Sequence, residues 1–259
     1  QVWRSIYFVP MWLGFPMENA YLSFTKGWPL KRISYAASFG TDKWEYNEEQ
    51  TLHSREALQM FDAVSVREEN GVKLCKQYFD VDALHVLDPT MLLDVNEYIE
   101  LFKQKQTPKS KGNLLNYVLD ETDEIESLIK KVASMKKMVP FAVNNPYEGD
   151  NTKPLNQRIK PSVEAWLRGF YDADFVITDS FHACVFSIIF KKQFIVIGNK
   201  ERGMARFESL LKMFGLEERL VDEKVDVNNL YPIDYDKVYN LYGQLKERSL
   251  HFLSENLVS

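Results

Sequence analysis

The sequence predicts an α/β fold built on a parallel sheet that helices cover. From residue 113 onward the hydrophobic period alternates between strand and helix, which is typical of consecutive strand–helix units. The predicted strands are short and apolar, as expected for strands buried on both faces. The 259 residues, 45% apolar and 14% aromatic, suffice for one large domain or two of ordinary size.

Four strand–helix units are predicted in the second half. The strands are expected at Leu114–Leu119, Val139–Val143, Asp174–Thr178 and Phe194–Ile197. The helices are expected to begin near Asp123, after Pro161-Ser162 and after Asp179, and the fourth to end at Gly215. Consecutive units of this kind predict one parallel sheet over residues 113–221, with helices on both faces.

The first half shows the same alternation in a poorer form. Strands are expected at Ile33–Ala37, Ala63–Val66 and Leu84–Leu87, and helices from near Asn47, with Gln50 at capping-box spacing, and from about Glu68 to Phe79. Residues 1 to 30 contain no strand–helix pair and are predicted to be an irregular aromatic segment.

A polar stretch with a proline, Gln104–Lys111, predicts the linker between two domains. We therefore expect an N-terminal domain over residues 1–107 and a C-terminal domain over residues 108–233. The last helix, residues 234–257, is expected to return to the first domain.

Composition excludes several classes of protein. The 32 basic and 37 acidic side chains give a net charge of −5 without a dense basic block, so nucleic acid is not an expected partner. Cys75 and Cys184 lie far apart on apolar helix faces, which indicates no disulfide framework and no metal site. Phe181–Phe190 is too short to span a bilayer, and the first residues lack a secretory pattern, so a cytoplasmic location is expected.

His182 is the best catalytic candidate. It opens an almost wholly apolar helix just beyond the carboxyl end of a predicted strand, with Asp179 as the expected N-cap. A helix N-terminus there offers N–H groups to an anion, and a bound anion would raise the pKa of the imidazole and prepare a general acid. The alternative is a core histidine with no chemical role.

Arg67 directly follows the predicted strand Ala63–Val66. Its guanidinium suits a carboxylate or a phosphate, and a surface ion pair is the alternative. Lys200, Arg202 and Arg206 cluster at the start of a later helix, although charged residues are common in such loops.

Other polar residues are given structural roles. Asp88, after the strand at residues 84–87, could act as a base, but capping a turn is the favoured interpretation. His53 and His85 are expected to be structural, and His251 to lie on a face of the last helix. The sequence contains no Walker loop, dinucleotide fingerprint or nucleophile elbow.

Four segments in order resemble the polysaccharide pyruvyl transferase family. They are Ile33–Gly40, Ser65–Glu68 followed by Gly71, Asp88–Leu93, and Thr178–His182 with Gly198-Asn199 downstream. The resemblance runs from Gln1 to about Val221. It implies two Rossmann-like domains in a glycosyltransferase-B-like arrangement with the site in the cleft between them, and an N-terminal domain that lacks its first strands.

The resemblance also implies an activity. Members transfer a pyruvyl group from phosphoenolpyruvate, without a cofactor, to two hydroxyls of a sugar as a cyclic ketal during synthesis of bacterial exopolysaccharide or capsule. The implied acceptor is a sugar or a lipid-linked oligosaccharide, which would bring the enzyme to the membrane surface. His182 would be the acid and Arg67 an anion clamp.

This chain departs from the family at one position. Many members carry arginine two residues before the histidine, where this chain has Ser180. Either Lys200, Arg202 or Arg206 supplies the second cation, or the donor is different. A glycosyltransferase that uses a sugar nucleotide and an inactive relative that binds a polysaccharide intermediate are the competing functions.

Overall fold

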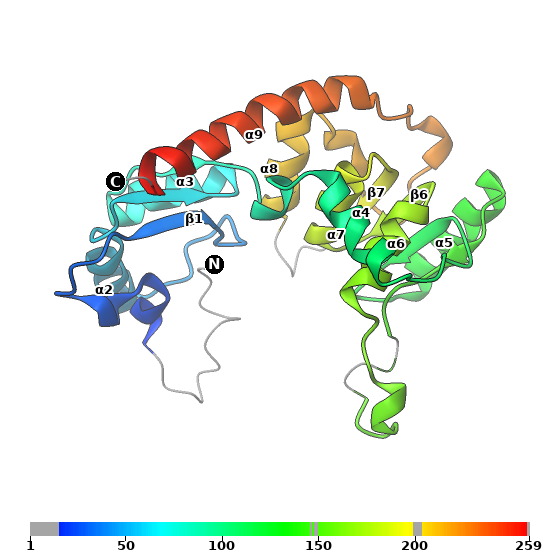
Figure 1. The fold of residues 1–259 in the computed structure, drawn as a ribbon, viewed down its shortest axis with the longest axis horizontal. Helices are drawn as coiled ribbons and strands as arrows, with labels where there is room; N and C mark the ends of the chain where they lie inside the picture. The colour runs from blue at the N-terminus through cyan, green and yellow to red at the C-terminus, as the bar shows by residue number, and fades with distance from the viewer. Residues whose placement is uncertain (1–15, 146, 148–149, 199–203, 258–259) are drawn as a thin grey trace. The chain divides into compact units, whose positions relative to one another are not determined.

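A computed structural model describes residues 16–145, 147, 150–198 and 204–257 (Figure 1). It is a mixed α/β structure with two parallel sheets. The chain divides into two compact units. Unit 1 contains the described residues of Gln1–Leu92, Asn199–Gly215 and Asp236–Ser259, and unit 2 those of Leu93–Gly198 and Leu216–Tyr235.

Unit 1 is built on a three-stranded parallel sheet in the order β1-β2-β3. The strands are β1 (Ile33–Ala37), β2 (Ala63–Val66) and β3 (Leu84–His85). The helices are α2 (Glu48–Leu58), α3 (Glu69–Leu74) with the π-helical turn η4 (Cys75–Phe79), α8 (Ala205–Phe214) and α9 (Tyr235–Leu257). Short 3-10 turns lie at η2 (Met17–Tyr21), η3 (Ser23–Thr25) and η5 (Pro89–Met91). The strand positions follow the sequence pattern closely, although β3 is shorter than expected.

An aromatic cluster forms much of the core of unit 1. The buried rings of Tyr21, Phe39, Tyr46 and Phe79 pack within 6.4 Å of one another, centroid to centroid, in a chain of contacts. The hydroxyls of Tyr21 and Tyr46 are hydrogen bonded at 2.7 Å. The segment before β1, as far as it is described, is irregular as predicted, and it packs Met17 and Tyr21 into this core.

The long helix α9 packs on the sheet of unit 1. The backbone N–H of Leu87 donates to Ser249 Oγ at 3.0 Å, and the Tyr242 hydroxyl donates to the carbonyl of Met91 at 2.8 Å. Phe252 packs with Ala36 of β1. These contacts join the last helix to residues more than 150 positions earlier in the chain.

Unit 2 contains a five-stranded parallel sheet in the order β5-β4-β6-β7-β8. The strands are β4 (Leu114–Tyr117), β5 (Pro140–Phe141), β6 (Phe175–Thr178), β7 (Gln193–Ile197) and β8 (Leu220–Val221). The helices are α4 (Val95–Gln104), α5 (Asp123–Lys136), α6 (Val163–Asp172) and α7 (Phe181–Ile189), and 3-10 turns lie at η6 (Leu155–Gln157), η8 (Glu217–Arg219) and η9 (Val227–Asn229).

The predicted parallel sheet with helices on both faces is confirmed in unit 2, but the fourth predicted helix, α8, belongs to unit 1. Every residue of β6 is buried, which requires cover on both sides. Phe175 and Ile177 of β6 join the cluster formed with the apolar face of α5. The helix α7 packs against β6 and β7 as well. The carboxyl ends of β4, β5 and β6 therefore form one edge where loops can gather.

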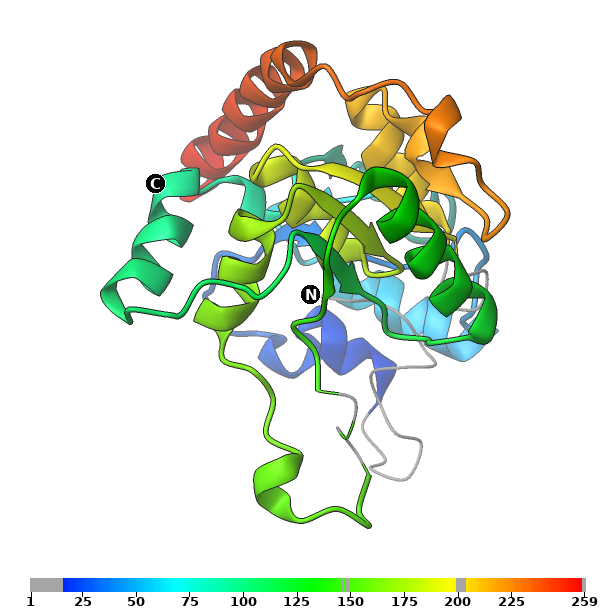
Figure 2. The ribbon, with the colours of Figure 1, turned by 90° about the vertical axis from the view of Figure 1, so that its right-hand side faces the viewer.

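The connection from β5 to α6 is a long loop without a core of its own. Among the described residues from 139 to 166 none is buried. Leu155 and Ile159 are 73% and 65% exposed. Figures 1 and 2 show this loop extending away from the sheet of unit 2. In the described part of the chain, no helix is both long and apolar enough to cross a bilayer.

Candidate functional site

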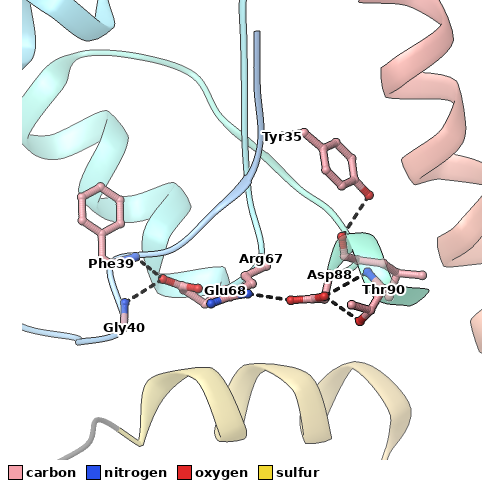
Figure 3. Close-up of polar contacts among 8 residues, drawn as sticks. Tyr35, Phe39, Gly40, Arg67, Glu68, Asp88 and Thr90 are labelled. Atoms are coloured by element: carbon pink, nitrogen blue, oxygen red, sulfur yellow. Dashed lines mark hydrogen bonds and ion pairs between the residues drawn. The ribbon is translucent and has the colours of Figure 1, made fainter. Parts of the chain in front are cut away.

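Arg67 and Asp88 form a buried ion pair at the carboxyl edge of the sheet of unit 1 (Figure 3). Arg67 follows β2 and Asp88 follows β3, and Arg67 Nη1 lies 2.6 Å from Asp88 Oδ2. The two side chains are only 9% and 1% exposed. The sequence analysis offered a surface ion pair as the alternative role of Arg67. Arg67 does pair with a carboxylate, but the pair is buried and does not lie on the surface.

Asp88 also caps the turn that follows it, as the sequence favoured. Its Oδ1 accepts hydrogen bonds from the backbone N–H of Thr90 at 3.0 Å and from the Thr90 hydroxyl at 2.7 Å. One carboxylate thus fixes both the turn η5 and the guanidinium. The guanidinium is a planar fork of N–H groups, and Asp88 holds it through Nη1. Such an arrangement orients Arg67 for a planar anion.

Glu68 is a component of this edge that the sequence did not single out. It is fully buried, and its Oε1 accepts from the backbone N–H groups of Phe39 at 2.5 Å and Gly40 at 3.1 Å (Figure 3). Burial raises the pKa of the Glu68 carboxyl, although the Gly40 N–H and the Arg67 guanidinium oppose the rise. The carboxyl thereby joins the loop after β1 to the loop after β2. The signals in the sequence were its place at the start of a predicted helix and in the segment Ser65–Glu68 that resembles the family.

The strand β1 contains an irregularity just before this loop. Ala36 has a φ of 51°, and the pairing register with β2 shifts between Ser34 and Ala37. The Ser65 hydroxyl accepts from Ala36 N–H at 3.0 Å and donates to the Ser34 carbonyl at 2.9 Å, so a side chain replaces part of the strand pairing. A bulge of this kind redirects the chain that follows it.

His182 lies in unit 2, in the first turn of α7 beyond the carboxyl end of β6. Its side chain is exposed, whereas Phe181 and Ala183 on either side are buried. Its ring lies near the ring of Phe181, with centroids 5.5 Å apart. The alternative of a core histidine is therefore wrong, and the imidazole is accessible to a ligand.

Asp179 has a different role from the one expected. Its carboxylate accepts from the backbone N–H groups of Leu119 at 2.8 Å and Asp120 at 2.9 Å. Ser180 occupies the N-cap position of α7, without a side-chain capping bond. The predicted N-cap at Asp179 is wrong, because N–H groups from the loop after β4 bind this carboxylate. Asp179 thus ties that loop to the turn that carries His182.

Thr178 strengthens the same turn. Its hydroxyl donates to the Tyr117 carbonyl at 2.6 Å and accepts from Ser180 N–H at 2.9 Å. Thr178 and Asp179 are buried, so these bonds are shielded from water. The residues before His182 therefore form a rigid support for the exposed ring.

The cluster of cations is described only in part. Lys200 and Arg202 lie outside the described residues. Arg206 is half-buried in the first turn of α8, in unit 1. This helix is fixed to α3, since Glu69 N–H donates to Ser209 Oγ at 2.8 Å and Lys212 Nζ lies 2.7 Å from Glu69 Oε2. Arg206 thus belongs to the same unit as Arg67.

The other histidines fit structural roles. His85 Nε2 lies 3.3 Å from Ser209 Oγ, linking β3 to α8, and burial lowers the pKa of its ring. His53 Nδ1 lies 3.8 Å from Glu18 Oε1, and His251 is exposed on α9. Among the described residues, no group of three or more histidine, cysteine, aspartate or glutamate side chains could hold a metal ion.

Comparison with known proteins gives one family model and solved structures of low similarity. A family model described as polysaccharide pyruvyl transferase matches residues 14–201, which is more than half of the chain. No curated protein matches. A structure of the wall teichoic acid polymerase TagF is 14% identical over 87% of this chain and 60% of its own, with a TM-score of 0.36. A TagF variant soaked with CDPG is 13% identical over 89% of this chain and 61% of its own, with a TM-score of 0.37. The chain thus spans about three fifths of these structures.

Proposed function

This chain belongs to the polysaccharide pyruvyl transferase family, and from that premise we propose that it transfers a pyruvyl group from phosphoenolpyruvate to two hydroxyls of a sugar as a cyclic ketal. The observation that supports this most directly is the exposed imidazole of His182, held on a buried turn beyond the carboxyl end of β6. Such a position suits a general acid that meets its substrate from solution.

The proposed reaction needs one proton at the start and returns it later. An acid adds a proton to the methylene carbon of phosphoenolpyruvate, which makes the neighbouring carbon an oxocarbenium-like centre. One sugar hydroxyl attacks that centre, and a second hydroxyl closes the ring as phosphate leaves. One hydroxyl proton restores the acid, and the other leaves with phosphate. The products are a ketal and inorganic phosphate.

His182 is proposed as the acid. The N-terminus of α7 disfavours an imidazolium ion, but a bound phosphate or carboxylate favours it. Donor binding would therefore protonate the ring when it is needed. The hydrogen bonds of Thr178 and Asp179 hold the turn before the ring, which limits the loss of orientation during the reaction.

Arg67 is proposed as a donor clamp. Its buried pair with Asp88 fixes the guanidinium before a ligand binds, so less conformational entropy is lost on binding. Ser180 stands where many family members have arginine, and Arg206, Lys200 or Arg202 is proposed to supply the second cation. The roles of Arg67 and His182, which lie in different units, are proposed separately, each from its own surroundings.

The wider setting is part of the same proposal. The two-domain glycosyltransferase-B-like arrangement, a cytoplasmic location and a lipid-linked acceptor that brings the protein to the membrane surface are all implied by the resemblance to the family. No resident cofactor takes part in the proposed reaction.

The experiment combines donor, acceptor and one pair of variants. The protein is incubated with phosphoenolpyruvate and a galactoside, phosphate release is measured, and NMR detects the ketal methyl group. In His182→Gln, turnover should fall by about 10²–10⁴, the usual contribution of a general acid, while donor affinity changes much less. His251→Gln, an exposed histidine on α9, is the matched control. A folded His182→Gln protein with near-normal turnover would exclude the catalytic role.

A second function is favoured by one specific observation. Ser180 replaces a cation in the motif, and a chain that binds a saccharide without transferring pyruvate would have no need of that cation. For such a binding protein, the same experiment would show no phosphate release with any galactoside, whereas a titration without phosphoenolpyruvate would show that a galactoside binds.

A further inference from the structure

Unit 2 contains a pocket of about 260 Å³ at the carboxyl edge of β4 and β5. Tyr117 ends β4, Asn144 and Asn145 follow β5, and Lys160, Val163 and Trp166 lie at the start of α6. Ligands of parallel α/β sheets bind beyond the carboxyl ends of the strands. The volume is just under the range of roughly 300–1,000 Å³ seen for drug-sized ligands, so it suits a ligand of a single ring.

One wall of the pocket is aromatic and firmly supported. The rings of Trp166 and Tyr117 meet edge to face with centroids 5.7 Å apart. Behind them, the Trp166 ring packs on Phe170 at 4.5 Å and on Phe186 at 4.9 Å. Trp166 and Tyr117 are themselves only half-buried, so their ring surfaces border the pocket. A supported ring surface binds an apolar ligand face with little loss of conformational entropy.

The other lining residues include polar side chains. Asn144 is held by a bond from its Nδ2 to the Val118 carbonyl at 3.2 Å. Asn145 donates to the carbonyls of Gln157 and Ile159 at 2.9 and 2.8 Å. An amide oxygen has two lone pairs, so Asn144 Oδ1 can accept from a ligand hydroxyl while its nitrogen stays bound. Lys160, which is exposed, adds a positive charge to the lining of the pocket.

A glycine allows the close packing that forms part of the pocket. A Cβ at Gly169 of α6 would lie 2.5 Å from Val143 Cγ1, which is closer than two carbon atoms can approach. Val143 precedes Asn144 and lines the pocket. The absence of a side chain at Gly169 thus lets the start of the loop pack directly against α6.

The pocket lies beside the turn that carries His182, within the same unit. Tyr117 and Thr178 are register partners in the sheet, and Thr178 comes four residues before His182. Strands are about 4.8 Å apart, and β6 adjoins β4, so two strand spacings, roughly 10 Å, separate β5 from the strand before α7. This separation suits neighbouring parts of one substrate.

From these features we infer that the pocket binds one sugar ring of the acceptor saccharide. A sugar ring has an apolar C–H face, which matches the aromatic wall, and a rim of hydroxyls, which matches the amides and Lys160. The inference rests on the proposed function and deepens it, because it assigns the acceptor to unit 2 and to named residues.

The test measures glycoside binding apart from catalysis. The full chain is titrated with methyl galactoside and methyl glucoside in the absence of phosphoenolpyruvate, and binding is followed by saturation-transfer NMR. Asn144→Ala should weaken binding by about three- to tenfold and Trp166→Ala by about tenfold. Trp166→Phe should bind more weakly than the unmodified chain but more tightly than Trp166→Ala. Asn156→Ala removes an exposed amide of the same loop outside the pocket and should bind like the unmodified chain. Circular dichroism establishes that each variant is folded.

The outcomes separate the pocket from the reaction. Unchanged glycoside binding in folded Asn144→Ala and Trp166→Phe, or no binding of either glycoside to the unmodified chain at millimolar concentration, would overturn the inference. If the variants lose glycoside binding and yet no ketal forms with phosphoenolpyruvate, the sugar-binding role of the pocket is supported and the proposed function fails. If ketal forms with an acceptor KM that the variants do not change, the function stands and the pocket is wrong.

Discussion

At the scale of single residues, Arg67 and Asp88 form an ion pair in which each charge compensates the other. Both side chains are almost fully buried. Removing one partner of a buried pair leaves the other charge without compensation in a poorly solvated place. The pair therefore contributes to the orientation of Arg67 and at the same time makes the fold sensitive to either substitution.

We expect Asp88→Ala to reduce the free energy of unfolding by about 3–5 kcal/mol, because it leaves the buried guanidinium without its carboxylate. Urea denaturation would measure the change. Glu100→Ala is the control, since Glu100 pairs with Lys103 where both side chains are more than half exposed, and its loss should cost less than about 1 kcal/mol. Equal losses in the two variants would contradict the buried pair.

Glu68 gives a prediction about pH. Because burial raises the pKa of its carboxyl in the folded state, the folded state holds the proton more tightly than the unfolded state does. The resulting stabilisation is complete below the ordinary pKa near 4.5 and is lost as the pH rises through the folded pKa. Glu68→Gln removes this ionisation and keeps an oxygen for the Phe39 and Gly40 N–H groups.

The expected result is that Glu68→Gln becomes more stable than the unmodified chain as the pH rises above about 4.5, while the two converge below it. Melting temperatures between pH 4 and pH 8 would measure the difference. Glu49→Gln, on the exposed first turn of α2, controls for the loss of one surface charge. A difference that grows towards low pH would show that the pKa is shifted in the opposite direction.

The sequence identified some of these residues and missed others for physical reasons. Arg67 stands directly after β2 and His182 four residues after β6, and the carboxyl ends of strands are where α/β proteins place functional groups. The hydrogen bonds from Leu119 and Asp120 to Asp179 connect residues about 60 positions apart, and no local pattern encodes them. Glu68 is a similar case, because its partners Phe39 and Gly40 lie almost 30 positions earlier.

At the scale of elements, the end of α5 offers a test of helix termination. Lys137 ends this helix with a φ of 54°, a left-handed conformation that glycine adopts more readily than lysine. The helix α8 also ends in this conformation, at Gly215, with a φ of 65°. The two helices thus use the same backbone geometry with different residues.

Lys137→Gly should therefore raise the free energy of unfolding by about 0.5–1 kcal/mol, the balance between relieved strain and the greater entropy of an unfolded glycine. The midpoint of urea unfolding would report it. Lys131→Gly, at an exposed position inside the same helix, should instead lower stability by about 1 kcal/mol. If both substitutions destabilise the protein equally, the left-handed conformation assigned to Lys137 is wrong.

Most elements could be predicted because their signals are local. Asn47 and Gln50 form both hydrogen bonds of the capping box, at 2.8 and 3.1 Å, and α2 begins where that box predicts. The helix α4 was missed, although Asp94 caps it and Tyr98 and Phe102 form its buried side. It has only ten residues, and its short apolar face lies next to the polar stretch interpreted as a linker.

At the scale of the whole molecule, the two units are not continuous segments of chain. The sequence placed a boundary at residues 107 and 108, whereas α4 belongs to unit 2 and α8 to unit 1. Contacts between distant segments decide this, since Glu69 binds Ser209 and Lys212, and Phe214 packs on Tyr242 with centroids 5.9 Å apart. Hydrophobic periodicity describes each helix separately and carries no information on which sheet it joins.

The loop between β5 and α6 has a consequence for how such proteins diversify. It contributes Asn144, Asn145 and Lys160 to the pocket, yet no described residue from 139 to 166 is buried. Insertions and deletions there would leave the sheet and its core unchanged, because loop closure costs little with added length. If the pocket binds a sugar ring as inferred, exchange of this segment is expected to change which saccharide binds while the sheet and its core are retained.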